Sequence, residues 1–249
     1  MNGDMKYEPI LLAGVRFAVY TNSKKTAERL AEFRGDFGPN DAQAAITLTG
    51  KKVQRERELA ENGGFYAEHT LELIVLHREV AELLPRFNAL AAHASVIEMD
   101  GKGVIFLGES GAGKSTHSRL WRERFGERVS MINDDKPLLR LENGRFWVCG
   151  SPWKGKHGLG NSSIAPLCAA VFINKAKTDS VRAMSAYEYW RLMPAQVLIP
   201  NDAGRALNAL SLLDKLKTTG VKVLSLNCTA EHSAAELACR AVFGELPKD

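Results

Sequence analysis

The strongest constraint on the fold is the run Gly108-Glu109-Ser110-Gly111-Ala112-Gly113-Lys114-Ser115-Thr116, which matches the pattern GxxxxGK[ST]. A short apolar run, residues 103–107, precedes it. Glycines let the backbone fold closely around a phosphate, and a following helix directs the positive end of its dipole toward the anion. The pattern therefore predicts a strand, a phosphate-binding loop and a helix that extends to about Arg124, with a nucleotide as ligand.

Each part of this loop has an expected task. We expect residues 108–116 to hold the nucleotide, with Lys114 reaching its outer phosphates and Ser115 binding Mg²⁺. Because the loop contacts phosphates rather than the base, the sequence leaves ATP, ADP and pyrophosphate open as donors. ATP with Mg²⁺ is the expected pair.

A second strand is predicted over residues 91–99, and Asp100-Gly101 suits a type I′ hairpin turn between it and the strand before the loop. With that turn, Met99 faces Lys102, and His93 falls opposite Gly108 at the phosphate site. A lone histidine in an apolar strand is also common as a core residue, and both interpretations stay open. The hairpin predicts an antiparallel entry into the loop, and hence a mixed sheet.

Two adjacent acids end the next predicted strand, residues 129–132, in the sequence Asn133-Asp134-Asp135. One carboxylate can hold Mg²⁺ while the other accepts the proton of an attacking hydroxyl. Taken alone, the run is ordinary turn chemistry. Its position downstream of the phosphate loop favours the functional interpretation.

The segment Gly150 to Gly158 has too many glycines and cations for a strand. We expect a flexible loop in which Lys154, Lys156 and His157 neutralise charge on a transferring phosphate, although a plain solvated loop fits as well. Trp153 is interpreted as a hinge anchor, a ring that stacks on the nucleotide, or core.

The N-terminal part carries no motif. We expect a strand over residues 9–20, a helix over residues 21–33, and an amphipathic helix over residues 70–87 that Pro85 ends. His69 and His77 are interpreted as surface residues. The predicted division is a small α/β lobe over residues 1–87 and a nucleotide-binding catalytic domain over residues 88–249.

Composition excludes several classes of protein. The chain of 249 residues has 33 Lys and Arg against 29 Asp and Glu, and its formal net charge of +4 comes without a long basic run, so we expect neither nucleic acid nor membrane as partner. The four cysteines are widely spaced, without a CxxC pair, which favours reduced thiols in the cytoplasm. The N-terminal apolar run is too short and too polar for a signal peptide or a membrane span.

His93 with its strand, GESGAGKST, NDDKP and GSPWKGK together resemble the HPr kinase/phosphatase-like proteins, relatives of the ATP-dependent phosphoenolpyruvate carboxykinases. The resemblance covers residues 88 to about 175. It implies an α/β P-loop domain with a mixed, partly antiparallel sheet, and an ATP-dependent kinase that phosphorylates a Ser-like hydroxyl of a peptide, protein or small metabolite. It also implies Asp134 as general base, Asp135 as metal or support residue, and His93 as partner of the acidic pair, beside the catalytic Lys156 expected above.

Two departures from the family pattern narrow this expectation. Only His157-Gly158-Leu159-Gly160 stands where bifunctional family members carry Arg-Gly-Leu-Gly, which puts HPr as substrate and phosphatase activity in doubt. The arginines of true carboxykinases are not found. A carboxykinase-like enzyme and a nucleotide-binding regulator remain the alternatives, and homo-oligomeric assembly into a ring stays open.

Overall fold

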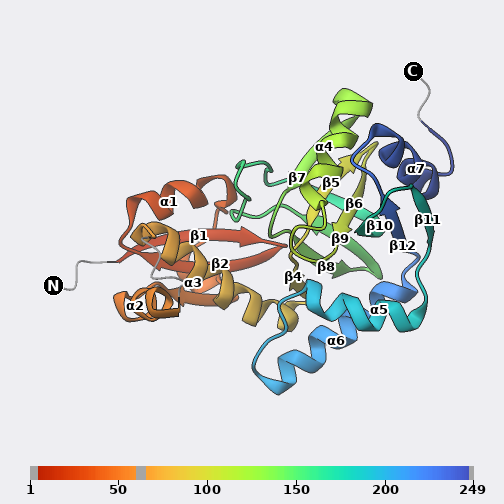
Figure 1. The fold of residues 1–249 in the computed structure, drawn as a ribbon. Coiled ribbons are helices and arrows are strands. Elements are labelled where there is room, and N and C mark those ends of the chain that lie inside the picture. Colours follow the sequence, from red (N-terminus) through yellow and green to blue (C-terminus); the bar gives the residue numbers. More distant parts are fainter. Residues whose placement is uncertain (1–4, 60–65, 247–249) are drawn as a thin grey trace.

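The computed structural model describes residues 5–59 and 66–246, which form seven α-helices and two β-sheets. Helices and strands are interspersed along the chain, so the molecule is of the mixed α/β class (Figure 1). No helix in the described ranges is long and apolar enough to cross a membrane.

The N-terminal region is built on a three-stranded sheet in the order β1-β2-β3. β1 and β2 are antiparallel, whereas β3 is parallel to β2. Three helices accompany this sheet. The bounds are Lys6–Leu12 (β1), Val15–Thr21 (β2), Lys24–Leu30 (α1), Ala44–Thr47 (β3), Gly50–Leu59 (α2) and Glu68–Leu83 (α3).

Two expectations for this region were wrong. The single strand expected over residues 9–20 is a hairpin, because Ala13 and Gly14 adopt left-handed φ angles of 47° and 73° and reverse the chain. The helix expected from residue 21 begins later: the Ser23 side chain accepts a hydrogen bond from the backbone N–H of Thr26 and caps α1.

The larger sheet has nine strands. Seven follow the order β4-β8-β9-β10-β6-β5-β7, β12 pairs with β10, and β11 pairs with β12. β10 is parallel to β6 and β12 but antiparallel to β9, so the sheet is mixed as predicted. The bounds are Ala89–Ala91 (β4), Ser95–Met99 (β5), Lys102–Leu107 (β6), Val129–Asn133 (β7), Leu138–Glu142 (β8), Arg145–Cys149 (β9), Ile164–Lys175 (β10), Ser180–Ala183 (β11) and Lys222–Cys228 (β12).

Helices cover both faces of this sheet, because successive side chains of a strand point to opposite sides. Val104 and Phe106 pack with α4 and α7, whereas Ile105 and Leu107 share a core with α5 and α6. The helix bounds are Lys114–Phe125 (α4), Ala186–Leu192 (α5), Ala203–Thr218 (α6) and His232–Phe243 (α7).

A third core joins the N-terminal region to the larger sheet. Ile10, Phe17 and Leu76 belong to the same buried cluster as Leu138 and Trp153. The division at residue 87 stays a prediction.

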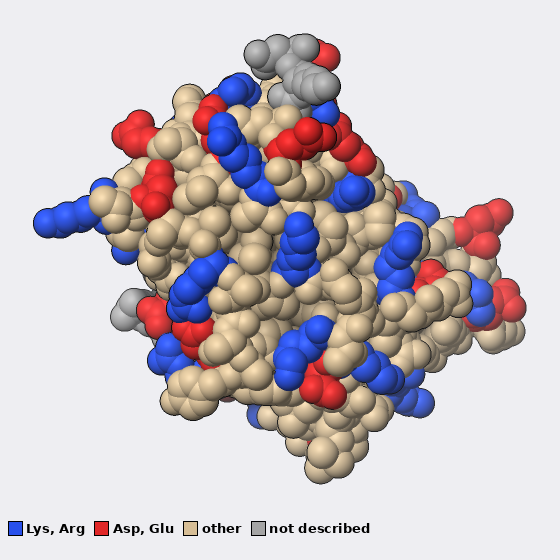
Figure 2. All heavy atoms as spheres, turned by 90° about the vertical axis from the view of Figure 1, so that its right-hand side faces the viewer, with Lys and Arg blue, Asp and Glu red and all other residues tan. Residues whose placement is uncertain are grey.

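The face that carries α7 and β11 shows a scattered charge distribution. Figure 2 shows its lysine and arginine side chains interspersed with acidic groups and uncharged surface. This arrangement agrees with the small net charge of the whole chain.

Candidate functional site

The phosphate-loop sequence lies between β6 and α4, as its pattern predicts. Gly108 has a φ of 141°, and a Cβ there would approach the carbonyl oxygen of Ile173 to 2.9 Å, so only glycine fits. Gly113 precedes the helix with a φ of 106°. The backbone thus turns sharply away from the sheet and presents the N-terminus of α4 to solvent.

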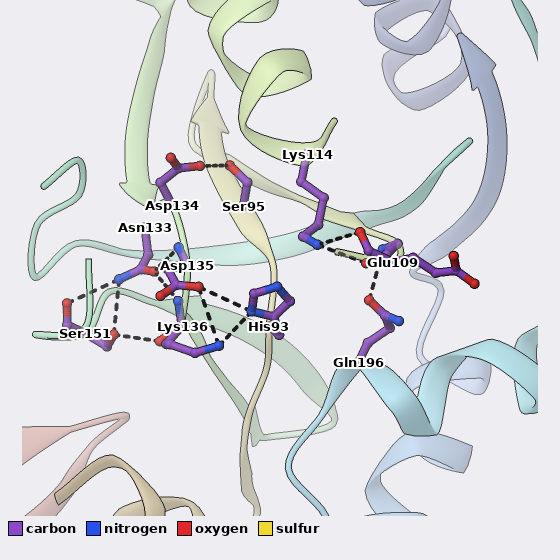
Figure 3. A network of polar contacts seen from close by, with 11 residues as sticks. His93, Ser95, Glu109, Lys114, Asn133, Asp134, Asp135, Lys136, Ser151 and Gln196 are labelled. Atoms are coloured by element: carbon purple, nitrogen blue, oxygen red, sulfur yellow. Dashed lines mark hydrogen bonds and ion pairs between the residues drawn. The ribbon is translucent and has the colours of Figure 1, made fainter. Parts of the chain in front are cut away.

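The side chain of Lys114 is held inside this turn. Its Nζ donates to the carbonyl oxygens of Gly108, at 2.9 Å, and of Glu109, at 3.2 Å (Figure 3). Burial and the charge of Lys136 lower the pKa of Lys114, while the two aspartates nearby oppose that shift. The positive charge therefore lies at the site where the loop would receive an anion.

Gln196 links the loop to the histidine segment. The backbone N–H of Gly108 donates to Gln196 Oε1 at 2.9 Å, and the backbone N–H of His93 donates to the Gln196 carbonyl at 2.8 Å. The ladder between β5 and β6 ends at the pair Ser95 and Phe106. The expected pairing of His93 with Gly108 was therefore wrong, since Gln196 lies between them.

His93 nevertheless lies beside the acidic turn. Its neighbours Ala92 and Ala94 donate backbone hydrogen bonds to the carbonyls of Pro137 and Asp135, both at 3.0 Å. Residues 92–94 thus run alongside residues 135–137, although no named strand includes them. This pairing brings the imidazole to the acids.

The two aspartates face different partners. Asp134 is buried, and its Oδ1 accepts a hydrogen bond from Ser95 Oγ at 2.8 Å. Ser95 Oγ also lies 2.9 Å from Ser118 Oγ on α4. Asp134 therefore faces the first turns of the helix that follows the phosphate loop.

Asp135 belongs to a contact of three ionisable side chains. His93 Nδ1 lies 3.2 Å from Asp135 Oδ1, and Lys136 Nζ lies 2.7 Å from His93 Nδ1 and 3.5 Å from Asp135 Oδ1 (Figure 3). Burial would raise the pKa of Asp135, but the ammonium of Lys136, through its charge and its contact with the carboxylate, lowers it. Asp135 is therefore ionised at neutral pH.

We assign the tautomer of His93 from this contact. An ammonium group has donors and no acceptor, so Lys136 Nζ can approach Nδ1 to 2.7 Å only if Nδ1 accepts. The proton of the neutral ring then resides on Nε2. Lys136 consequently bridges the ring and Asp135 rather than competing with the ring for the carboxylate.

Asn133 shapes the acidic turn. Its Oδ1 accepts the backbone N–H groups of Asp135, at 2.9 Å, and Lys136, at 2.8 Å. Its Nδ2 donates to the backbone carbonyl of Ser151, at 3.2 Å, and the Ser151 Oγ donates to the Lys136 carbonyl at 2.6 Å. The amide thus fastens the acidic turn to the start of the glycine-rich loop.

The glycine-rich loop packs directly on the acids. A Cβ at Gly155 would lie 2.9 Å from the carbonyl oxygen of Asp134. Lys154 turns away and pairs with Glu32 at 2.7 Å, so it does not face the phosphate loop as expected. Trp153 is buried and donates its indole N–H to the Leu73 carbonyl at 2.8 Å, which identifies it as core.

These elements enclose a cleft of about 440 Å³. Most of the predicted site residues line it: His93, Ser110, Gly111, Gly113, Lys114, Ser115, Thr116, Asp134, Asp135 and Lys156. Gly108, Glu109 and Ala112 line a neighbouring cavity on the other side of the loop. The structure thus gathers the basic, hydroxyl and acidic groups in one depression.

Three residues of the site were missed from the sequence. Lys136 directly follows the acids, so its position was a usable signal. Lys175 lines the cleft from the end of β10. The polar pair that ends this apolar strand was a usable signal. Gln196 lies 88 residues from Gly108, and nothing in its local sequence marks it.

The donor set suits Mg²⁺ bound together with a nucleotide. Ser115 and Asp135 present oxygen ligands on one cleft, beside the carboxylate of Asp134, and oxygen ligands are what Mg²⁺ prefers. Within residues 5–59 and 66–246, no group of three or more His, Cys, Asp or Glu side chains could hold a metal ion. Phosphate oxygens and water would have to complete the coordination.

Comparisons with known proteins give weak structural similarity and no sequence match. No protein-family model matches the chain. No curated protein matches it. A solved structure, the Hpr(Ser) kinase/phosphatase from Coxiella burnetii, superposes with a TM-score of 0.28 and 16% identity over 51% of this chain and 96% of that chain. A superposition at this level transfers neither fold nor activity, so the family relation remains a resemblance carried by the motifs.

Proposed function

We propose that the protein is an ATP-dependent phosphotransferase with an HPr-kinase-like site, which moves the γ-phosphoryl group to a hydroxyl of a peptide, protein or small metabolite. One observation carries the proposal. Two carboxylates and a histidine lie on the same cleft as Lys114 and Ser115 of a phosphate loop. A protein that only binds nucleotide needs the loop but has no use for a base beside it.

The chain's residues divide the reaction between them. Lys114 exchanges its two carbonyl contacts for the outer phosphates, and Ser115 with Asp135 would hold Mg²⁺, which supplies charge neutralisation on those phosphates. Lys156 enters from the glycine-rich loop and neutralises the transferring group. His93, with its proton on Nε2, is a hydrogen-bond donor toward the cleft.

Asp134 is the proposed general base. The acceptor oxygen forms a bond to the γ-phosphorus while the bond to the bridging oxygen breaks, and ADP leaves with that electron pair. The hydroxyl proton passes to Asp134. Ser95 holds the carboxylate in place through Oδ1.

A nucleoside donor is supported by a second cavity, of about 380 Å³, next to the loop. It adjoins Thr116 and is lined mainly by apolar groups such as Leu120 and Ile173. His117 in its wall accepts the indole N–H of Trp121 on Nε2 at 3.0 Å, so Nδ1 carries the ring proton. That buried donor has no partner among the described residues, which suits a base with an acceptor nitrogen or carbonyl better than pyrophosphate.

The test is transfer of label from Mg-ATP carrying a radioactive γ-phosphate into a fractionated extract of the source cells. Asp134→Asn should lower incorporation by about 10²- to 10⁴-fold, because it removes the base, and should leave the affinity for a fluorescent ATP analogue within about twofold. The matched control Asp214→Asn, on the exposed surface of α6, should transfer normally.

Transfer by Asp134→Asn at the wild-type rate would contradict the assignment of the base. Nucleotide binding without any labelled acceptor in the wild type would favour a nucleotide-binding regulator. Labelling from pyrophosphate but not from ATP would change the donor and keep the reaction class.

A further inference from the structure

A cavity of about 370 Å³ lies on the opposite side of the His93–Asp135–Lys136 contact from the phosphate loop. Asp135 lines both this cavity and the phosphate cleft, and Lys136 lines the cavity while it touches His93 in the cleft. The three-residue contact is therefore the wall between the two spaces. A molecule in the second cavity would lie beside the proposed reaction centre.

Besides the acidic turn with Asp135 and Lys136, three separate segments of the chain form this cavity. α3 contributes Ile74 and His77, the glycine-rich loop contributes Trp153, and Leu198 closes the cavity from the segment after the 3-10 turn at Met193–Gln196. Figure 1 shows α3 running from the N-terminal sheet toward the larger sheet. The cavity thus forms where the N-terminal region meets the larger sheet and its phosphate loop.

The lining of the cavity is largely apolar, and its charged side chains are paired with groups of opposite charge. Ile74, Trp153 and Leu198 present hydrocarbon and aromatic surface. The guanidinium of Arg78, also in the lining, is bound to Glu56 through Nε and Nη2, and the ammonium of Lys136 lies against Asp135. The cavity therefore favours an uncharged occupant.

His77 supplies an unused polar atom. The sequence interpretation of a surface residue was wrong: its ring packs edge-on against Trp153, with centroids 4.9 Å apart, and its buried Nε2 has no hydrogen-bond partner in the described part of the chain. Burial, with the charge of Lys136, lowers the pKa of His77 to about 4, so the ring is neutral at pH 7. A buried polar nitrogen without a partner costs about 1–3 kcal/mol, and such groups normally meet a ligand or water.

We propose that this cavity binds an uncharged apolar group of the phosphoacceptor, of ring size or a branched alkyl, with a polar atom of the acceptor bonded to His77 Nε2. The inference rests on the proposed kinase function and specifies its substrate class. Its basis is the shared wall, because a side group in this cavity places the rest of the molecule against Asp135 and the cleft. The nucleotide has its own cavity at Thr116, on the far side of the loop.

Binding of two small probes tests the cavity without knowledge of the natural acceptor. N-acetylphenylalaninol has a ring, a neutral amide and a hydroxyl, and N-acetylalaninol lacks only the ring. We expect the ring probe to bind at least tenfold more tightly in calorimetric titration, and to change the fluorescence of Trp153. A Trp153→Phe variant assigns that signal among the four tryptophans.

Filling the cavity should abolish this preference. Ile74→Trp adds a ring to the lining, so both probes should bind with the affinity of N-acetylalaninol, and incorporation of label from ATP into the cell extract should fall at least tenfold. Thr70→Trp adds the same ring one turn earlier on α3, outside the lining, and should change neither measurement. Leu198→Phe fills the cavity from another segment. The same loss in both filled variants would exclude misfolding of one variant as its cause.

Failure of this inference is distinguishable from failure of the proposed function. Equal affinity of the two probes for the wild type, or an unchanged preference in both filled variants, overturns the cavity even where label transfer is normal. A ring preference in a wild type that transfers no label overturns the kinase, and with it the acceptor role of the cavity.

Discussion

At the residue scale, Lys136 determines which nitrogen of His93 carries the proton. The Lys136 ammonium donates a hydrogen bond to His93 Nδ1 at 2.7 Å, so the ring proton stays on Nε2. In Lys136→Met, Nδ1 is free to donate to Asp135 Oδ1, 3.2 Å away, and we expect the ring to change tautomer. Nitrogen-15 chemical shifts of the His93 ring at pH 8 report that change directly.

The consequence for the reaction follows from the tautomer. With Nε2 turned from donor to acceptor, His93 no longer donates into the cleft, so phosphoryl transfer by Lys136→Met should fall at least tenfold with little change in nucleotide affinity. Lys136→Arg keeps the donors and should retain the wild-type tautomer. An Nδ1 proton already present in the wild-type protein would contradict the assignment.

At the scale of elements, the hairpin between β5 and β6 holds the histidine segment beside the loop. Its turn residues Asp100 and Gly101 have φ angles of 51° and 74°, as a type I′ turn requires. A Cβ at Gly101 would meet no atom within 4 Å, so Gly101→Ala adds only backbone strain. We expect a loss of about 1 kcal/mol in the free energy of unfolding, measured in urea.

A second glycine provides the control for this strain. Gly50 also has open space where an added methyl group would lie, but its φ is not in the left-handed range and it begins α2. Gly50→Ala should be neutral or slightly stabilising, because alanine favours helix. Equal losses at both positions would show that the turn geometry is not the cause.

The same hairpin shows how far sequence reasoning reaches. The turn type, the facing of Met99 with Lys102 and the mixed sheet follow from local chemistry, and the structure confirms them. Extending the strand pairing from this turn as far as His93 gave the wrong partner. The backbone N–H of Gly108 donates instead to the side chain of Gln196, from a distant segment. Local rules specify a turn, but they carry no information on which remote residue will satisfy the next backbone group.

At the scale of the whole molecule, the N-terminal region and the P-loop part share one core and several polar ties. Beyond the buried cluster, Glu82 of α3 bonds to Arg205 of α6 at 2.9 Å, and Trp153 bonds to α3. We therefore expect unfolding in urea to be a single transition, with coincident curves from circular dichroism and tryptophan fluorescence. A separate early transition would show that the N-terminal region folds on its own.

The half-buried His77 and the buried His117 make that single transition dependent on pH. Burial lowers the pKa values of His77 in α3 and of His117 in α4 from 6.5 to about 4. Below pH 6.5 the unfolded chain binds protons that the folded chain refuses until about pH 4, so stability is full above this window and falls as the pH drops through it. Each pKa unit corresponds to about 1.4 kcal/mol, so His117 alone accounts for about 3 kcal/mol.

His117→Gln keeps an acceptor for Trp121 and removes the titration, and it should weaken the pH dependence of unfolding between pH 6.5 and 4 by roughly that amount. An unchanged slope in this variant would mean that His117 binds its proton alike in the folded and unfolded chain, and would contradict the assignment of this pH dependence to its burial.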